Sequence, residues 1–340
     1  MRQIVLEHGF GIEHLTERTA AKPVIKPDEV LVRMQAAALN YVDLAIVEGA
    51  LGQNLPLPLI PVADGAGIIA ETGASVQEFK AGELVSTLYI PSWPSGRYLP
   101  CHTGLEIRPG TGYTAGQLSE YKAFKPHEII RAPEHFSPLE AATLPIAALT
   151  AWNALIYGGI KPGDTVLIHG TGGVALFALQ FAKLSGAKVI ITSSSNEKLA
   201  KASNLGADVT INYKTPGDLV QDIKDASGGA GADLVVETVG GQNVAKSQAA
   251  LKPQGHISVV GFIGGIEASL NLIELNLKRA SITGVSVGST QDFRDMLAAV
   301  TLHKLKPVID AVYPLERTAE AFRHMKSGAH SGKIVISLEG

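Results

Sequence analysis

The chain has 340 residues, of which 46% are hydrophobic and 18% charged, and its formal net charge is −3. This composition is typical of a compact globule with one large or two medium-sized domains and excludes a disordered chain. The net negative charge argues against a nucleic-acid binder, because such proteins neutralise phosphates with basic residues. The single cysteine, Cys101, cannot build a disulfide framework or a cysteine-rich zinc site within one chain.

Hydrophobic residues are spread over many short runs. The first residues, MRQIVLEHGF, lack the long apolar core of a signal peptide. No segment reaches the roughly 18 consecutive apolar residues that a membrane span needs. We therefore expect no membrane partner and a cytoplasmic location.

Residues 1–125 have the pattern of short strands and turns, which predicts a β-rich first domain. Residues 29–40 alternate and then become apolar, and residues 56–73 suggest two strands broken by proline and glycine. Residues 89–117 have no clear periodicity. A long irregular stretch in a compact domain is usually a functional loop or lid.

The pattern changes near Ser137, which precedes Glu140 at the spacing of a capping box and predicts a helix over 137–156. Strands and helices then alternate, and the strands are almost entirely apolar. This alternation predicts a doubly wound parallel sheet of the α/β class, covered on both faces. We expect this second domain at 126–266 and a return to the first domain at 267–340.

A glycine-rich turn follows the first strand of that sheet. Gly170, Gly172 and Ala175 match G-x-G-x-x-G/A between a strand and a helix, and Gly173 and Val174 open the helix. Such a turn lets the backbone approach a pyrophosphate at the positive end of a helix. The pattern predicts dinucleotide binding, and its alternative is a glycine turn without a ligand.

The end of the next strand suggests which dinucleotide binds. An acidic residue usually accepts the ribose 2′-hydroxyl of NAD at this point, but the chain has Ser193, Ser194 and Ser195, followed by Lys198. Hydroxyls and an ammonium suit a 2′-phosphate, which a carboxylate would repel. We therefore predict NADPH as the cofactor. The alternative is that these residues only cap a helix.

Further residues lie at the ends of later strands, the edge where ligands bind open α/β sheets. Tyr213 is expected to flank the adenine or its ribose, although plain packing is the alternative. Four more residues are expected at the cofactor, with ordinary tight turns as their alternative: Thr238, Val239, Gly261 and Phe262.

Several segments together resemble a known family. They are LNYVDLAIVEGAL, PLIPVADGAGIIAETG, GQLSEY, AATLPIAALTAWNAL, HGTGGVALFALQFAK and SGKIVI. Over essentially its whole length the chain resembles the medium-chain dehydrogenase/reductase superfamily, and within it the zinc-independent, quinone-oxidoreductase-like branch with its alcohol-dehydrogenase-like relatives. The resemblance implies a GroES-like catalytic domain, a Rossmann domain and a homodimer. It also implies that Thr150 contacts the nicotinamide and that Lys333 approaches the cofactor.

Zinc-containing members of this family hold their catalytic metal with a Cys, a His–Glu pair and a second Cys. Matching the motifs places Asn40 at the first position, Ala63 and Asp64 at the pair, and Ile146 near the last. A lone carboxylate does not hold zinc against water. We therefore expect no metal.

Without zinc, hydrogen-bond donors must stabilise the oxyanion that hydride transfer creates. Asn40 and Tyr41 are the expected catalytic residues, through an amide and a phenol; plain packing is the alternative for Tyr41. Asp64, Tyr89 and Trp93 are expected at the substrate pocket. Structural pairing is the alternative for Asp64, and a small core within the 89–117 loop is the alternative for the two aromatic residues.

Together these features predict an NADPH-dependent, zinc-independent reductase of quinones or α,β-unsaturated carbonyls, which delocalise the developing charge. One alternative is a metal-free NADP(H) alcohol or aldehyde dehydrogenase. Another is an NADPH-binding protein with a structural or regulatory role and no turnover.

Overall fold

Two β-sheets organise the chain in a computed structural model, which describes residues 1–51 and 54–339. Unit 1 comprises Met1–Ala147 and Gly288–Gly340, and unit 2 comprises Ala148–Val287. Both boundaries fall later than the expected 125 and 266. Strand β7 (Ile129–Arg131) pairs with β5 (Leu84–Thr87) of unit 1, whereas β13 (Ser281–Gly284) pairs with β12 (Leu251–Val259) of unit 2, so sheet pairing assigns each segment.

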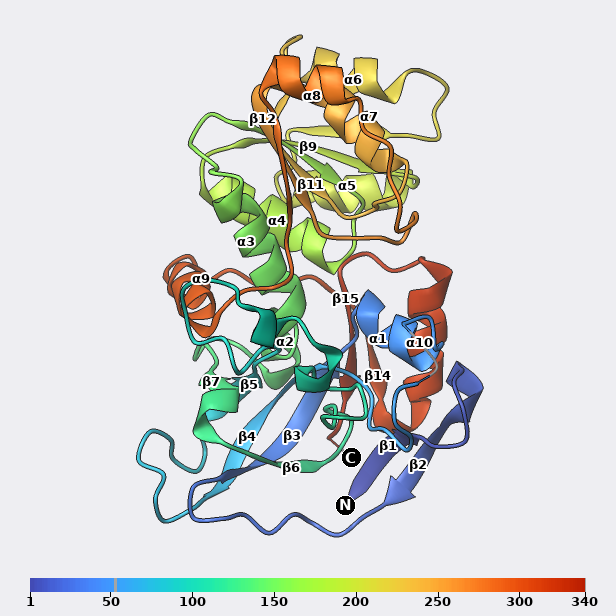
Figure 1. The fold of residues 1–340 in the computed structure, drawn as a ribbon. Helices are drawn as coiled ribbons and strands as arrows, with labels where there is room; N and C mark the ends of the chain where they lie inside the picture. The colour runs from blue at the N-terminus through green and yellow to red at the C-terminus, as the bar shows by residue number, and fades with distance from the viewer. Residues whose placement is uncertain (52–53, 340) are drawn as a thin grey trace. The chain divides into compact units, whose positions relative to one another are not determined.

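Unit 2 confirms the predicted doubly wound α/β fold. Its six strands are all parallel, in the order β10 (Val209–Asn212), β9 (Lys188–Ser193), β8 (Thr165–His169), β11 (Ala232–Glu237), β12 and β13. Figure 1 shows α6, α7 and α8 gathered on one side of this sheet and α3 and α4 on the other. The helices are α3 (Leu149–Tyr157), α4 (Gly173–Leu184), α5 (Asn196–Asn204), α6 (Leu219–Ala226), α7 (Asn243–Ala250) and α8 (Leu272–Lys278).

The strand order reverses next to β8. The chain leaves β8 for β9 on one side, and β11 lies on the other. In open α/β sheets the crevice at the carboxyl ends of such strands receives the ligand. The sheet interior is apolar, with Leu167, Ile190 and Val235 fully buried, because both faces are covered by helices.

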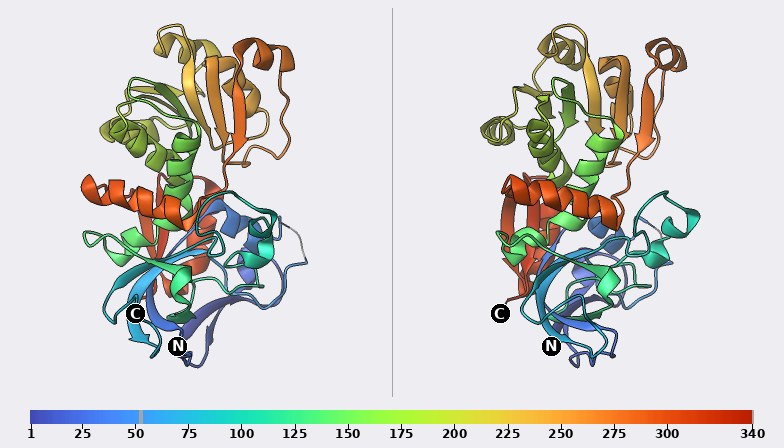
Figure 2. Two further views of the ribbon diagram at one scale, coloured as in Figure 1. Left: turned by 60° about the vertical axis from the view of Figure 1, so that its left-hand side comes forward. Right: turned by 90° about the vertical axis from the view of Figure 1, so that its left-hand side faces the viewer.

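Unit 1 is built on a seven-stranded sheet in the order β14, β15, β3, β4, β5, β7, with β6 paired to β3. Both ends of the chain belong to this unit (Figure 2). Its further elements are β1 (Arg2–Leu6), β2 (Leu15–Thr19), β3 (Val30–Ala38), α1 (Tyr41–Val47), β4 (Asp64–Thr72), β6 (Tyr121–Phe124), α2 (Pro138–Ala141), α9 (Thr290–Leu302), β14 (Ile309–Pro314), α10 (Thr318–Ser327) and β15 (Lys333–Ser337).

Two local predictions need correction. Residues 56–73 contain one strand, β4, and not two; before it, where prolines cannot donate to a ladder, Leu59 makes only an isolated bridge with Leu6. The helix expected over 137–156 begins at Ser137, whose Oγ accepts the Glu140 N–H at 3.3 Å as predicted, but it is interrupted by a π turn at Leu144–Ala148. Pro145 lies in that turn and lacks the N–H that a regular α-helix would use.

Candidate active site

The glycine turn after β8 has the geometry that a phosphate needs. Gly170 has a left-handed φ of +80°. Gly172 precedes α4 with no side-chain cap, and a Cβ placed on Gly172 would meet nothing within 4 Å. The first N–H groups of α4, at Gly173 and Val174, therefore face an open approach. Such a helix start suits an anion, and the residues present fit a dinucleotide pyrophosphate.

The serines at the end of β9 also cap a helix. Ser195 is the N-cap of α5, and its Oγ accepts the Lys198 N–H at 3.4 Å. The Ser195 N–H in turn reaches the Ser193 Oγ at 3.4 Å. The helix-cap interpretation thus holds for Ser195. It does not conflict with cofactor binding, because the cap uses the Ser195 oxygen as an acceptor and not the hydroxyl proton that would donate to a phosphate.

One cavity of unit 2 opens at the end of β9, where Thr192 lines it, and we call it the Tyr213 cavity. Ser193, Ser194 and Ser195 are not among its lining residues. Its volume is about 520 Å³. Its lining includes Gly170, Thr192, Tyr213, Val239, Asn243 and Lys246. The Tyr213 side chain is 51% exposed, while its N–H donates to the Ser193 carbonyl at 3.1 Å. Gly170, Tyr213 and Val239, which the sequence analysis assigned to the cofactor, therefore lie around one space.

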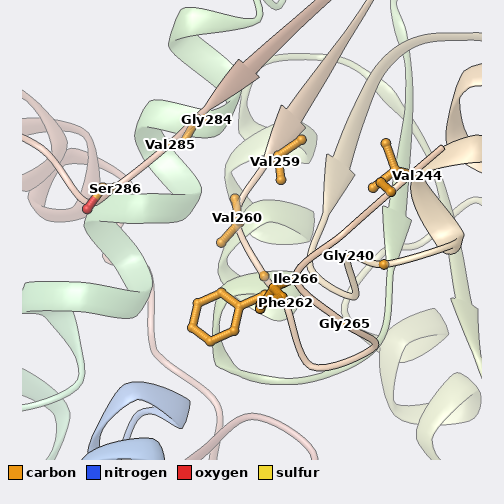
Figure 3. Close-up of a pocket in the computed structure, with 13 residues that line it drawn as sticks. Gly240, Val244, Val259, Val260, Phe262, Gly265, Ile266, Gly284, Val285 and Ser286 are labelled. Atoms are coloured by element: carbon orange, nitrogen blue, oxygen red, sulfur yellow. The ribbon is translucent and has the colours of Figure 1, made fainter. Parts of the chain in front are cut away.

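A second cavity, the Phe262 cavity, has a volume of about 450 Å³ (Figure 3). Figure 3 shows the carbon side chains of Val259, Val260 and Phe262 around it. Gly261 and Phe262 were predicted at the cofactor and line this second space. Thr238 does not line either cavity; its hydroxyl donates to the His169 carbonyl at 2.5 Å. Thr150 is buried in α3 of the same unit.

Unit 1 gathers three polar residues, Asn40, Asp64 and Lys333, at one end of its sheet, and Asp43 of α1 joins them through the Asn40 N–H. Asn40 directly follows β3, Asp64 opens β4 opposite Ala38, and Lys333 opens β15 beside the end of β3. Three neighbouring antiparallel strands therefore bring together residues that are far apart in the chain. The Lys333 Nζ donates to the Asn40 Oδ1 and to the Leu39 carbonyl, both at 2.6 Å.

The Asn40 amide is fully used inside this network. Its Nδ2 donates to the Asp64 Oδ2 at 2.9 Å and to the Ala38 carbonyl at 3.3 Å. An amide has two N–H groups, and both are taken, so the geometry favours a positioning role for Asn40 over the expected donation to a substrate oxyanion. Lys333 likewise uses two of its donors within unit 1, and its expected contact with the cofactor stays a prediction.

Both carboxylates of the network are buried. Asp64 is 0% exposed, so structural pairing, the alternative to a substrate contact, is the role that the geometry favours. Asp43 accepts the Asn40 N–H at 2.8 Å and the Ala63 N–H at 2.9 Å, which ties α1 to β4. Burial raises the pKa of Asp43 to about 6 and also raises the pKa of Asp64, while burial lowers the pKa of Lys333.

This network includes the positions that the family resemblance assigns to the metal ligands of zinc-containing members. The Ile146 N–H donates to the Asp64 Oδ2 at 3.2 Å, so the Asn40, Asp64 and Ile146 positions do meet. The groups that meet there are the Asp64 carboxylate, the Asn40 amide and the Ile146 backbone N–H. The Lys333 Nζ lies 3.9 Å from the Asp64 Oδ2. Among residues 1–51 and 54–339, no three His, Cys, Asp or Glu side chains are grouped to hold a metal. This donor set does not fit a zinc ion.

The predicted aromatic residues separate into two groups. Tyr41 opens α1 and is 41% exposed, so its phenol can meet a ligand. Trp93 is buried, and its Nε1 donates to the Gly96 carbonyl at 3.0 Å while its ring packs on Tyr98. These contacts favour the small loop core, which was the alternative for Trp93, and the expected place at the substrate pocket stays a prediction. Tyr89 is mostly covered, with the Arg108 guanidinium 4.8 Å from its ring centroid, and burial raises its pKa.

Sequence reasoning missed a buried polar cluster in unit 2. His169 ends β8 and Glu237 ends β11, and both are buried beneath the Tyr213 cavity. The only available signal was a polar residue that closes each apolar strand. Within the described part of the chain, no helix has both the length and the apolar character that crossing a membrane requires.

Comparisons with known proteins agree with this architecture. Residues 26–134 match the family described as alcohol dehydrogenase GroES-like domain, and residues 173–301 match the family described as zinc-binding dehydrogenase. A zinc-type alcohol dehydrogenase-like protein of Schizosaccharomyces pombe is 38% identical, over 100% of this chain and 99% of its own length. Human quinone oxidoreductase is 31% identical over 98% of this chain and 96% of its own.

The crystal structure of an NAD-dependent alcohol dehydrogenase has a TM-score of 0.89 and 32% identity, covering 99% of this chain and 100% of that one. Sequence and fold thus agree over the full length. The chain is therefore an oxidoreductase that belongs to the medium-chain dehydrogenase/reductase superfamily.

Proposed function

We propose that this protein is an NADPH-dependent reductase of quinones or α,β-unsaturated carbonyl compounds that works without zinc. The observation that carries the proposal is the Asn40–Asp64–Lys333 network at the positions of the metal ligands. Bound NADPH supplies a hydride. With no metal site, hydrogen-bond donors must stabilise the resulting oxyanion, which favours substrates that delocalise the charge.

Tyr41 is the proposed donor. Tyr41 is 41% exposed, and a phenol can donate a hydrogen bond or a proton to a developing enolate or hydroquinone oxygen. Both N–H groups of the Asn40 amide already donate within the network. The Asn40–Asp64–Lys333 network then has a positioning role in place of a catalytic one. It holds the first turn of α1 in place, because Asn40 is the N-cap and Asp43 completes the capping box.

NADPH is favoured over NADH by the chemistry at the end of β9. Ser193, Ser194 and Ser195 occupy the position of the usual acidic residue, and Tyr213 lies beside them. We expect Ser193→Asp to weaken NADPH binding by about 100-fold, since two like charges ~5 Å apart at an effective dielectric constant of ~20 repel by ~3 kcal/mol. Ser203→Asp, which adds the same charge at an exposed position of α5, is the matched control. Equal NADPH affinities for the two variants would defeat the serine-pocket hypothesis.

Steady-state assays of the purified wild-type protein test the reaction. We expect NADPH oxidation with quinones and enones and little with simple aldehydes, unchanged by a chelator, and less than a stoichiometric amount of zinc by elemental analysis. Stoichiometric zinc, or loss of activity on chelation, would contradict the proposal.

Two alternatives to this reaction remain testable. The similar protein titled NAD-dependent alcohol dehydrogenase supports the alcohol or aldehyde dehydrogenase alternative and an NAD cofactor. Faster turnover of alcohols with NAD or NADP than of enones with NADPH would decide for it. Tight NADPH binding with no turnover of any electrophile would instead favour the structural or regulatory alternative.

A homodimer is also part of the proposal, and the cytoplasmic location stays a prediction. Strand β13 is an edge strand, and the segment beside it exposes Ile266, Leu272, Ile273 and Leu277, at 88%, 70%, 74% and 78%. An open edge with exposed apolar side chains favours pairing with a second copy. Light scattering of the wild-type protein and of Leu277→Asp tests this; a wild-type monomer would contradict it.

A further inference from the structure

A fully buried carboxylate ends strand β11 between the two cavities of unit 2. Glu237 is 0% exposed, and each group around it is a donor. Its Oε1 accepts the N–H groups of Val239 at 2.8 Å and of Gly240 at 3.0 Å. Its Oε2 accepts the Asn243 Nδ2 at 2.8 Å and the Ser247 hydroxyl at 2.5 Å. These contacts shape the turn after β11, which lines both cavities, since Val239 borders one and Gly240 the other.

A hydrogen-bond chain runs from this carboxylate to the wall of the Tyr213 cavity. The Ser247 Oγ lies 3.0 Å from the His169 Nε2, and the His169 Nδ1 lies 3.0 Å from the Thr192 Oγ1. Glu237 can only accept, so Ser247 must donate to it and must accept from the His169 Nε2–H. The Nδ1 of His169 is then an acceptor, and Thr192 must donate to it. Burial lowers the pKa of His169, in keeping with a neutral ring.

The direction of this chain has a consequence at the cavity. The Thr192 hydroxyl proton is used by His169, so the Thr192 oxygen can only accept from a ligand. A hydroxyl or amino group of a bound nucleoside can meet it, whereas a phosphate oxygen, which has no proton to donate, cannot.

The turn is also fixed from its other side. The Gly264 N–H donates to the Val239 carbonyl at 2.7 Å, and a Cβ on Gly240 would overlap the Gly261 carbonyl. The 239–240 turn, which contributes to the walls of both cavities, is therefore held by Glu237 on one side and by Gly264 on the other.

We propose that Glu237 is a positioning residue for the dinucleotide, which acts on the nucleoside half through Ser247, His169 and Thr192 and on the nicotinamide half through the 239–240 turn. The inference rests on the proposed nicotinamide cofactor. It does not depend on the 2′-phosphate, because the chain of hydrogen bonds ends at a nucleoside donor.

Equilibrium binding to intact protein variants tests it, with NADPH and adenosine 2′,5′-bisphosphate as probes. Ser247→Ala separates His169 from Glu237 but keeps the 239–240 contacts, so we expect both probes to bind ~tenfold more weakly, the equivalent of one buried hydrogen bond. Glu237→Gln should weaken NADPH binding by a larger factor than bisphosphate binding, because only NADPH carries the nicotinamide half that the proposal assigns to the 239–240 turn. Glu197→Gln, whose side chain is 82% exposed on α5, is the matched control.

Two conservative variants of Thr192 control for misfolding. Thr192→Val removes the acceptor at the cavity wall and should weaken the bisphosphate as Ser247→Ala does, and Thr192→Ser should restore binding. Variants with lowered melting temperatures but control-like affinities for both probes would overturn the inference, since the cluster would then be purely structural. A wild-type protein that binds only NADH would defeat the proposed cofactor preference alone, since the same ratios are then measured with NADH and 5′-AMP.

Discussion

Replacing Lys333 with methionine tests the buried network of unit 1 most directly. The ammonium is 3% exposed and donates to the Leu39 carbonyl and the Asn40 Oδ1. Methionine keeps the apolar stem and removes the charge and both hydrogen bonds. Breaking a buried charged pair by removing one partner typically costs about 3–5 kcal/mol, and relief of the ammonium's own desolvation places the expected loss at the lower end, about 3 kcal/mol.

The loss should grow with pH. Burial raises the pKa of Asp64, and the Lys333 ammonium opposes that shift, so Lys333→Met raises the pKa further. A carboxyl with a higher pKa in the folded than in the unfolded chain binds its proton more tightly when folded. Its contribution to stability is present below the unfolded pKa and is lost as the pH rises through the folded pKa. The deficit should therefore be larger near pH ~8 than near pH ~6.

Urea unfolding followed by tryptophan fluorescence measures this loss. The chain has two tryptophans, Trp93 in unit 1 and Trp152 in unit 2, so a Trp152→Phe background reports on unit 1. Lys326→Met is the control, since Lys326 pairs with Glu48 at the surface, where an ion pair contributes less than ~1 kcal/mol. Adding Asp64→Asn to Lys333→Met should recover part of the loss. A deficit equal to that of the control at both pH values would refute this reasoning.

Three further changes test other parts of the molecule. The added methyl group of Gly261→Ala would overlap the Thr238 carbonyl and should lower the free energy of unfolding of unit 2 by about 2 kcal/mol, measured by urea unfolding. An unchanged midpoint would mean that the backbone at Gly261 can move away from Thr238 at no cost. Asp218 is the N-cap of α6 and accepts the Val220 and Gln221 N–H groups. Asp218→Ala should therefore lower the free energy of unfolding by ~1 kcal/mol, measured in the same way. A loss of only ~0.2 kcal/mol would contradict the capping role. Tyr41→Phe should lower turnover at least ~100-fold at unchanged NADPH affinity, and full activity would remove Tyr41 from the mechanism.

Local patterns were sufficient for unit 2. The apolar strands, the glycine turn at Gly170 and Gly172 and the Ser137 cap are each specified by residues a few positions apart, so the sequence predicted the parallel sheet correctly. The ligand-binding edge stays a prediction. The domain boundaries were harder to predict from the sequence, because strand pairing between distant segments decides them.

The polar networks depended on tertiary structure. Asn40, Asp64 and Lys333 meet only because β3, β4 and β15 are neighbours in one sheet, and Glu237 reaches Thr192 only through α7 and β8. The sequence shows which side chains carry polar groups but not which groups are already paired. Hydrogen-bond pairing between distant strands favours a positioning role for Asn40 over the expected donation to a ligand, because both protons of its amide are used inside the fold.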